Sequence, residues 1–467
     1  MAGAPLSTER PLPRGTLPSS NASPAPSAAI IEKAGFGGLV GFAVLDGATG
    51  EVIEETKGGH RMPPASTLKA VTTFYALDRL GPGYRFGTRV LMTGTRSGNR
   101  IDGDLILAGG GDPTLDTDRL GELAMALRET GITEVAGRFL VWNGALPQGR
   151  FIDGDQPDHV SYNPAFGGLN LNFNRVHFEW KRAGDDFNIT MQARATRLRP
   201  ATDVARMSVA DRKTPVFSYR PAYEGRGDRW SVARGALGRD GARWLPVRVP
   251  ALYCGDVFRT LARSNGIVLK APEVTDVLPM GAVPLAEVQS AELFDMLRSM
   301  MRYSTNLTAE AVGLSSSLAN GVPVGSLLSS GSRMAGWATT KFGTDDMQFR
   351  DHSGLGYGSA VSPVALAKIL SGAHTVRPLM RPVSLPDGAP RGADCVAKTG
   401  TLNFVSSLAG YLKTATGREL TFAILTADVA RRDAIPPEAR ERPPGARAWS
   451  RRSRSLQKAL LANWAKV

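Results

Sequence analysis

The strongest constraint in this sequence is the segment 63–69, which reads Pro-Pro-Ala-Ser-Thr-Leu-Lys. Two prolines hold the chain extended, because the residue before a proline avoids helical dihedral angles. Apolar residues then follow at helical spacing, and a Gly-Pro-Gly sequence at residues 81–83 ends the pattern. The segment therefore predicts a buried helix of about four turns, with Ser66 at its start.

Ser66 and Lys69 are three residues apart, so we expect both on one face of this helix. A hydroxyl becomes an effective nucleophile when a nearby base removes its proton, and an amine of lowered pKa is such a base. The helix N-terminus favours negative charge at Ser66 and disfavours positive charge at Lys69. An alternative stays open at this point: Ser66 caps the helix and Lys69 points into solvent. Ser455 and Lys458 have the same spacing, so a Ser-x-x-Lys pair alone does not identify a catalytic site.

Two further elements follow in order along the chain. Ser304-Thr305-Asn306 comes just after a predicted helix at 291–301, and Lys398-Thr399-Gly400 lies on a predicted strand at 396–401. Ser-x-Asn also occurs at 19–21 and 97–99, so it is the ordered combination of three elements that points to a site. A serine–lysine acyl-transfer enzyme combines these three elements.

Each residue of these elements has an expected role. The Ser304 hydroxyl relays a proton between Lys69 and the leaving amine, and Asn306 holds Lys69 and a substrate amide. Lys398 supplies positive charge for a substrate carboxylate, which it binds together with Thr399 or Thr401. Gly400 lets the strand approach the substrate backbone, and the Thr401 N–H joins that of Ser66 as an oxyanion hole.

Composition narrows the remaining classes of function. No apolar run approaches the roughly 18 residues that span a bilayer. The five histidines and two cysteines, Cys254 and Cys395, show no metal or redox spacing, so we expect no metal or cofactor and two buried cysteines. The formal net charge of +13 suits an anionic partner, so we expect the basic surface to contact a membrane or a cell-wall polymer. Without a zinc-finger or RNA-binding signature, we expect no nucleic-acid partner.

The pattern of elements divides the chain into an interrupted catalytic domain and an inserted middle. Residues 1–27 are rich in Pro, Ser and Ala and are expected to be disordered. Both ends of the remainder predict antiparallel strands with flanking helices, which assigns residues 28–85 and 285–467 to one catalytic domain. Residues 86–182 and 246–284 form an inserted domain, and residues 183–245 form a second, β-rich one. Alternation at 169–174 predicts a strand with asparagines on one face.

With these elements, the chain resembles the low-molecular-mass class C penicillin-binding proteins, the D-alanyl-D-alanine carboxypeptidase/endopeptidase family (peptidase family S13). Besides the three elements, the resemblance rests on the long insertion between Ser66 and Ser304. It also rests on Gly-Gly-Asp-Pro-Thr-Leu at 110–115, Leu-Asn-Phe-Asn at 171–174 and Asp-His-Ser-Gly-Leu at 351–355. It covers nearly the whole chain from about residue 28.

The resemblance implies an α+β fold of the β-lactamase/transpeptidase-like, penicillin-recognising type. A five-stranded antiparallel sheet would lie between helical clusters, with two smaller domains inserted after the Ser66 helix. It implies that Ser66 is the acylated nucleophile and Lys69 its base, with the catalytic site completed by Ser304, Asn306 and Lys398. The implied substrate is the peptide stem of peptidoglycan, and β-lactams would acylate Ser66 as covalent inhibitors. Such a substrate lies in the periplasm, so we expect export, with the export signal absent from this chain.

Two positions concern recognition of the third residue of the stem. Tyr357 stands where the resembling family has an arginine that binds the free end of a diaminopimelate side chain, and a tyrosine cannot supply that charge. Asp158 is similar in position to an acidic residue that faces the same pocket, and we expect both Asp158 and Tyr357 to bind substrate.

Two other functions stay open from sequence. A β-lactamase would add rapid deacylation, but the large insertion and the lack of an evident Glu-x-x-x-Asn loop argue against it. A non-catalytic sensor of stem peptides or penicillin would keep the fold without turnover, although a binder has no need of Lys69.

Overall fold

The computed structural model describes residues 27–467. The segment predicted to be disordered, residues 1–27, lies outside this range except for its last residue. Ser27 is buried and begins helix α1 (Ser27–Ala34), and its hydroxyl donates to the Glu54 carboxylate at 2.7 Å. The prediction is therefore wrong for Ser27, because a partner distant in sequence orders it.

A six-stranded antiparallel sheet joins the two ends of the chain. Its strands, in spatial order, are β19 (Arg381–Pro382), β20 (Asp394–Leu402), β21 (Val405–Lys413), β22 (Glu419–Ala427), β1 (Leu39–Asp46) and β2 (Val52–Thr56). The resemblance implied five strands; the sixth, β19, has two residues and pairs only with Val396 and Ala397. Two residues carry no alternating pattern, so this edge strand has no sequence signature.

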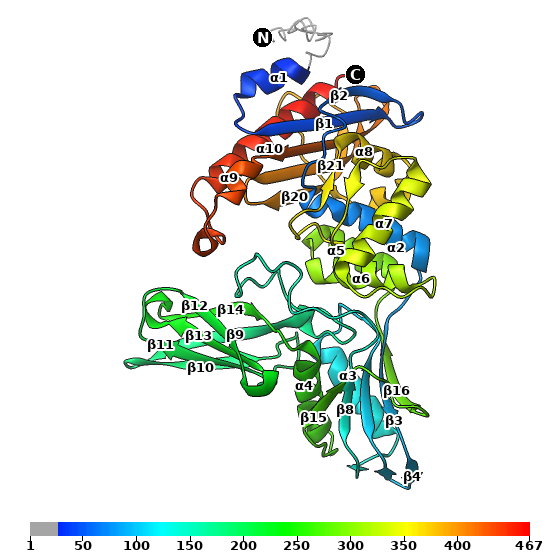
Figure 1. Ribbon diagram of the computed structural model, residues 1–467, viewed down its shortest axis with the longest axis vertical. Helices are drawn as coiled ribbons and strands as arrows, with labels where there is room; N and C mark the ends of the chain where they lie inside the picture. Colours follow the sequence, from blue (N-terminus) through cyan, green and yellow to red (C-terminus); the bar gives the residue numbers. More distant parts are fainter. Residues whose placement is uncertain (1–26) are drawn as a thin grey trace, which may run out of the picture.

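Strand alternation in this sheet builds one core on each face. In β1, Phe42 and Val44 pack with the C-terminal helix α10 (Ala446–Trp464), while Ala43 and Leu45 belong to the core on the other face. Five helices contribute to that second core: α2 (Leu68–Leu80), α5 (Leu293–Tyr303), α6 (Asn306–Leu318), α7 (Leu327–Phe342) and α8 (Pro363–Ser371). Figure 1 shows them grouped beside the sheet, opposite α1 and α10. A short pair, β17 (Met347–Gln348) and β18 (Ala360–Val361), completes this half.

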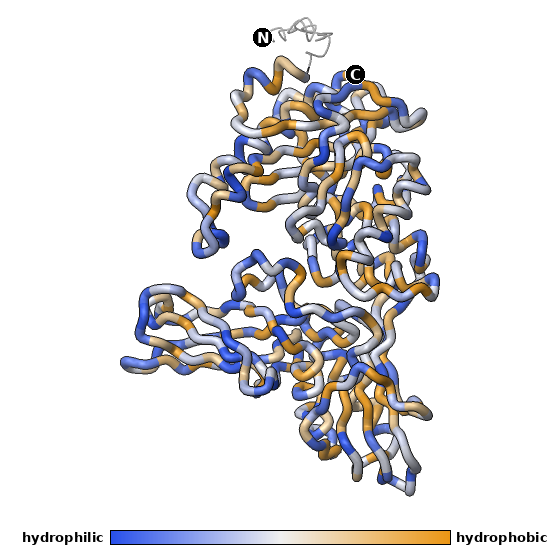
Figure 2. Tube along the Cα trace, in the orientation of Figure 1, coloured by the Kyte–Doolittle hydropathy of each residue, from blue (hydrophilic) through white to orange (hydrophobic). Residues whose placement is uncertain are grey.

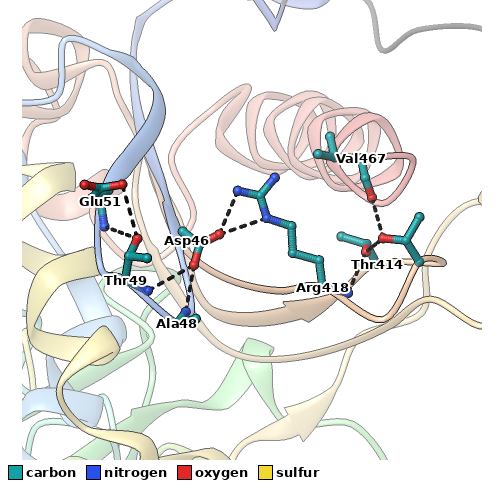
Figure 3. Close-up of polar contacts among 8 residues, drawn as sticks. Asp46, Ala48, Thr49, Glu51, Thr414, Arg418 and Val467 are labelled. Atoms are coloured by element: carbon teal, nitrogen blue, oxygen red, sulfur yellow. Dashed lines mark hydrogen bonds and ion pairs between the residues drawn. The ribbon is translucent and has the colours of Figure 1, made fainter.

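A pair of charged side chains ties the first hairpin to the last. Arg418, in the turn between β21 and β22, donates to the Asp46 carboxylate from Nε at 2.9 Å and from Nη2 at 2.7 Å. The second oxygen of Asp46 accepts from the backbone N–H groups of Ala48 and Thr49, which fixes the β1–β2 turn (Figure 3). The two ends of the chain are thereby held in one sheet.

The inserted part is built around a second sheet. Its five strands, in order, are β15 (Pro272–Thr275), β8 (Phe139–Trp142), β6 (Leu105–Gly109), β3 (Gly87–Met92) and β16 (Val283–Gln289). Helices α3 (Thr117–Glu129) and α4 (Pro250–Ser264) share its core. A small sheet of β4 (Thr95–Ser97), β5 (Arg100–Asp102) and β7 (Glu134–Val135) extends it. Cys254 is buried in this core, and Cys395 is buried beside α10, as the sequence predicts.

Two three-stranded sheets form the remaining lobe. One consists of β10 (Asp186–Gln192), β9 (Arg175–Ala183) and β14 (Asp240–Pro246). The other consists of β11 (Ala205–Ala210), β13 (Asp228–Ala233) and β12 (Phe217–Pro221). Figure 1 shows this lobe beneath the six-stranded sheet, and Figure 2 shows apolar residues concentrated along the strands of both halves. The division into three domains at the boundaries given above stays a prediction.

The predicted strand at 169–174 is not formed. Asn172, Phe173 and Asn174 instead make a 3-10 turn in which all three residues have positive φ angles, between 51° and 57°. Asparagine tolerates this region, and the turn is fixed by side-chain amides: Asn172 bonds Thr117, and Asn174 bonds Ala165. Alternation along the sequence could not reveal these partners.

The helices of residues 27–467 are all too short or too polar to pass through a lipid bilayer.

Candidate active site

Ser66 lies in a 3-10 turn, Ala65–Thr67, that leads directly into α2. Pro64 already has helical dihedral angles, so the turn begins at this second proline. Ala65 has a φ angle of 47°. Its carbonyl oxygen would lie 1.9 Å from a Cβ added to Gly354, so position 354 requires a glycine. The N-cap residue of α2 is Thr67 rather than Ser66, which excludes the alternative that Ser66 only caps the helix.

Lys69 is fully buried and faces Ser66. Its Nζ lies 2.9 Å from Ser66 Oγ and donates to Asn306 Oδ1 at 2.8 Å and to the Ser353 carbonyl at 2.7 Å. Burial, and then the nearby charge of Lys398, lower the pKa of Lys69 to about 7. With this pKa, about half of the amine is in its neutral, basic form at pH 7, so the pair meets the condition for an activated hydroxyl.

Two buried carboxyl groups hold the loop that receives Lys69. Glu310, on α6, accepts the backbone N–H groups of His352 at 2.9 Å and Ser353 at 3.0 Å. Asp351 accepts those of Gly354 at 2.9 Å and Gly356 at 2.5 Å. Burial raises the pKa of both carboxyl groups, and their mutual repulsion raises that of Glu310 further.

The Ser304–Asn306 element forms the turn between α5 and α6. Ser304 ends α5 in the left-handed region, with φ 58°, and Asn306 is the first residue of α6. Asn306 accepts from Lys69 with Oδ1 and donates through Nδ2 to the Tyr162 carbonyl at 2.8 Å. Because Tyr162 belongs to the inserted part, this one amide connects the two halves of the molecule.

Lys398 and Gly400 bring strand β20 against the Ser66 turn. Lys398 Nζ donates to Ser304 Oγ at 2.9 Å, and burial, followed by the charge of Arg381, lowers its pKa to about 8. A Cβ on Gly400 would lie 2.1 Å from Ser407 Oγ and 2.9 Å from the Ser66 nitrogen, so a side chain there would push the strand away. Beyond Ala397 the outer edge of β20 carries no strand partner within residues 27–467.

A cleft of about 610 Å³ opens in front of these residues. We call it the Ser66 cleft; Ser66, Ser304, Asn306, Thr401 and Tyr357 are among the residues that line it. Lys69 and Lys398 are buried behind this wall and Thr399 is exposed, while Gly400 lies against the Ser66 turn. The structure thus brings together residues from three distant parts of the sequence.

Of the two positions assigned to third-residue recognition, only Tyr357 reaches the cleft. Asp158 is exposed and is not among the lining residues; Asp153 and Asp155, three to five positions earlier, are. Tyr357 donates to Asp433 at 3.3 Å, and the Arg432 guanidinium lies over its ring, 5.6 Å from the centroid. Arg432 also lines the cleft, so a cation is present beside Tyr357 although the tyrosine carries no charge.

Sequence reasoning missed Glu310, Asp351 and Arg432. Glu310 had one usable signal, since an acidic residue four positions after Asn306 on an apolar helix faces the same side as that asparagine. Asp351 lies within the 351–355 segment, but its neighbours in sequence indicate no role for it. Arg432 is one of many basic residues near the C-terminus, and nothing in the local sequence distinguishes it.

Comparisons with known proteins agree with this arrangement. The family model described as "D-Ala-D-Ala carboxypeptidase 3 (S13) family" matches residues 28–442. The D-alanyl-D-alanine carboxypeptidase of an Actinomadura species is 27% identical over 442 residues, which is 85% of this chain and 79% of the relative. The D-alanyl-D-alanine carboxypeptidase DacB of Haemophilus influenzae is 24% identical over 427 residues, 84% of this chain and 86% of the relative.

Solved structures support the fold. The crystal structure of penicillin binding protein 4 from Haemophilus influenzae superposes with a TM-score of 0.76 at 20% identity, over 93% of this chain and 99% of that one. A structure of the same protein complexed with a β-lactam gives a TM-score of 0.70 at 20% identity, over 92% of this chain and 99% of that one. The fold is therefore α+β and of the penicillin-binding type, with extra sheets inserted. On the family match over residues 28–442, this chain belongs to the D-Ala-D-Ala carboxypeptidase 3 (S13) family.

Proposed function

We propose that this protein is a serine-type D-Ala-D-Ala carboxypeptidase that also cleaves cross-links as an endopeptidase, acting on peptidoglycan stem peptides through an acyl-enzyme on Ser66. The observation that carries the proposal is the contact of 2.9 Å between Ser66 Oγ and the buried amine of Lys69. Family membership and the names of the relatives support the same substrate. A peptidoglycan substrate places the protein outside the cytoplasmic membrane.

The acylation step follows from this geometry. Ser66 Oγ attacks the carbonyl carbon of the penultimate D-Ala while its proton passes to Lys69 Nζ. The oxyanion is stabilised by the backbone N–H groups of Ser66 and Thr401. The C–N bond then breaks, and the terminal D-Ala leaves with a proton delivered through Ser304. Water hydrolyses the resulting ester and restores the Ser66 hydroxyl.

Substrate binding uses the open edge of β20. An extended peptide adds to an unpaired strand edge through backbone hydrogen bonds. Lys398 and Thr399 or Thr401 bind the terminal carboxylate, and Gly400 leaves room for the peptide to approach. Cleavage of a D-Ala–diaminopimelate cross-link uses the same contacts, since a carboxylate also stands beside that scissile amide.

Recognition of the third stem residue is assigned to Arg432 together with Asp153. Arg432 lies beside Tyr357 in the Ser66 cleft, where it offers a cation to a side-chain carboxylate. Asp153 lines the same cleft and offers an acceptor to a side-chain ammonium. A zwitterionic side chain end would therefore find both charges.

The decisive experiment is intact-mass measurement after incubation with benzylpenicillin. We expect a stable single adduct on the wild-type protein and none on Ser66→Ala. Ser455→Ala is the matched control, because Ser455 starts the second Ser-x-x-Lys copy on the exposed side of α10, and it should keep the adduct. Penicillin left intact without an adduct would support a sensor, and penicillin consumed without an adduct would support a β-lactamase. Release of D-Ala from a stem peptide by wild type, absent in Ser66→Ala, would establish the peptidase.

A further inference from the structure

A second cleft, of about 600 Å³, lies next to the Ser66 cleft. It lies between the inserted part, represented by residues 160–162 and Arg243, and residues 441–451 near the C-terminus. Four residues line both clefts: Tyr162, Asn403, Ala446 and Arg447. We call it the arginine cleft. Its volume is that of a binding site for a small ligand or a short peptide.

The walls of the arginine cleft carry a positive charge that is not neutralised from within. Arg243, Arg442, Arg447 and Arg451 line it, against a single acidic lining residue, Glu441. Glu441 is already engaged, because its carboxylate receives His159 at 2.8 Å and Arg243 at 3.0 Å. The other three arginines are exposed, and no carboxylate within residues 27–467 lies in ion-pair distance of them.

The arrangement of these arginines follows helix α10 along both clefts. Arg447, Arg451 and Arg454 are spaced four and three residues apart, which puts them on one face of the helix. Arg454 and Arg447 line the Ser66 cleft, while Arg447 and Arg451 line the arginine cleft. Arg452 is also exposed on the same helix but lines neither cleft. Arginines that served only to keep the surface hydrated would not need to line up along a concave surface.

We propose that the arginine cleft binds a second stem peptide of peptidoglycan, the one joined through the cross-link to the peptide that Ser66 cleaves. This proposal rests on the proposed function. A cross-linked substrate must extend out of the Ser66 cleft, and the arginine cleft shares four lining residues with it. Stem peptides carry free carboxylates, and arginine binds carboxylates with paired hydrogen bonds. Hence the cleft provides selectivity for cross-linked over single stem peptides.

The experiment compares two substrates on the full-length protein. One is a single stem peptide that fills only the Ser66 cleft, and the other is a purified cross-linked muropeptide dimer. The variants are Arg451→Gln and the double variant Arg442→Gln/Arg451→Gln, with Arg452→Gln as the matched control. We expect the double variant to lower kcat/KM for the dimer by about three- to tenfold, as for exposed ion pairs. Cleavage of the single peptide and the rate of benzylpenicillin acylation should stay unchanged in all variants.

Salt and a binding measurement complete the test. The difference between wild type and the double variant on the dimer should shrink as ionic strength rises, because exposed charges are screened. Dimer affinity is also measured by calorimetry in a Ser66→Ala background, so that the cleft is tested without turnover. If the double variant Arg442→Gln/Arg451→Gln behaves as Arg452→Gln does in both assays, the arginine cleft is not a peptide site. A different outcome is that wild type cleaves neither substrate while the double variant still binds the dimer more weakly than the parent in the Ser66→Ala background. In that case the proposed function fails, and the assignment of the arginine cleft as a peptide site is kept.

Discussion

The Ser353 carbonyl oxygen lies 2.7 Å from the side-chain nitrogen of Lys69, and this contact fixes the amine opposite Ser66. The position of that carbonyl depends in turn on Glu310, which holds the N–H groups of both His352 and Ser353. Glu310 therefore acts on the reaction through Lys69, as a positioning residue.

Replacing Glu310 with glutamine should slow benzylpenicillin acylation by about tenfold or more. The amide can accept only one of the two backbone N–H groups, and the unpaired one should cost roughly 1–3 kcal/mol of unfolding free energy. Burial and then Asp351 raise the pKa of Glu310 itself to about 8, so it titrates together with Lys69. In its ionised form Glu310 raises the pKa of Lys69, so loss of this carboxyl group should also shift the acid limb of the pH profile to lower pH. Stopped-flow acylation across pH and denaturant unfolding measure both effects.

The control for this variant is Glu122→Gln, because Glu122 is half-exposed and pairs with Arg197 away from both clefts. It should leave the acylation rate and its pH profile unchanged. A slower rate in Glu310→Gln without movement of the acid limb would mean that Glu310 supports the fold alone.

The acylation rate should follow a bell-shaped pH profile. Lys69 acts as a base in its neutral form, so the rate should rise as pH increases through its pKa of about 7. Lys398 binds the substrate carboxylate in its charged form, so binding should weaken as pH increases through its pKa of about 8. The maximum is therefore expected between these values. Lys398→Arg keeps its charge at alkaline pH and should lose the falling limb, whereas a wild-type rate still rising at about pH 10 would contradict the assignment of Lys69.

Gly400→Ala should reduce acylation by about a hundredfold while the protein remains folded. The added methyl group would lie 2.1 Å from Ser407 Oγ and 2.9 Å from the Ser66 nitrogen, so β20 must move away from the nucleophile. Adduct formation followed by mass spectrometry, together with circular dichroism, measures the loss. Gly336→Ala is the control: nothing lies within 4 Å of a Cβ at this helical position. It should keep full activity and gain about 0.5–1 kcal/mol of stability. Equal acylation in both variants would show that β20 need not approach Ser66.

Arg432→Gln should reduce selectivity for a stem peptide whose third side chain ends in a carboxylate. A charge-assisted hydrogen bond contributes roughly 1.5–3 kcal/mol, so kcat/KM for a diaminopimelate peptide should fall about tenfold relative to a lysine peptide. Arg431→Gln is the control, because Arg431 lies over the ring of Phe404, 4.4 Å from its centroid, and does not line the Ser66 cleft. An unchanged ratio of the two substrates in Arg432→Gln would assign this recognition elsewhere.

The sequence by itself determined the features that depend on local spacing. The helix after Ser66 has an apolar period that is read from a few neighbouring residues, and the strand predicted at 396–401 lies within β20. The order of the three chemical elements along the chain was equally legible, because each element is a short fixed pattern.

Only the tertiary structure decided which groups surround those elements. The role of Glu310 arises from burial against a loop more than 40 residues away. The cation beside Tyr357 comes from Arg432, and the acidic groups in the cleft are Asp153 and Asp155 rather than Asp158. The pattern at 169–174 predicts a strand, but hydrogen bonds to distant Thr117 and to Ala165 hold these asparagines in a turn. The charged and polar partners of a side chain depend on packing between segments that are remote in sequence. A local sequence pattern therefore does not predict which remote group will lie beside it.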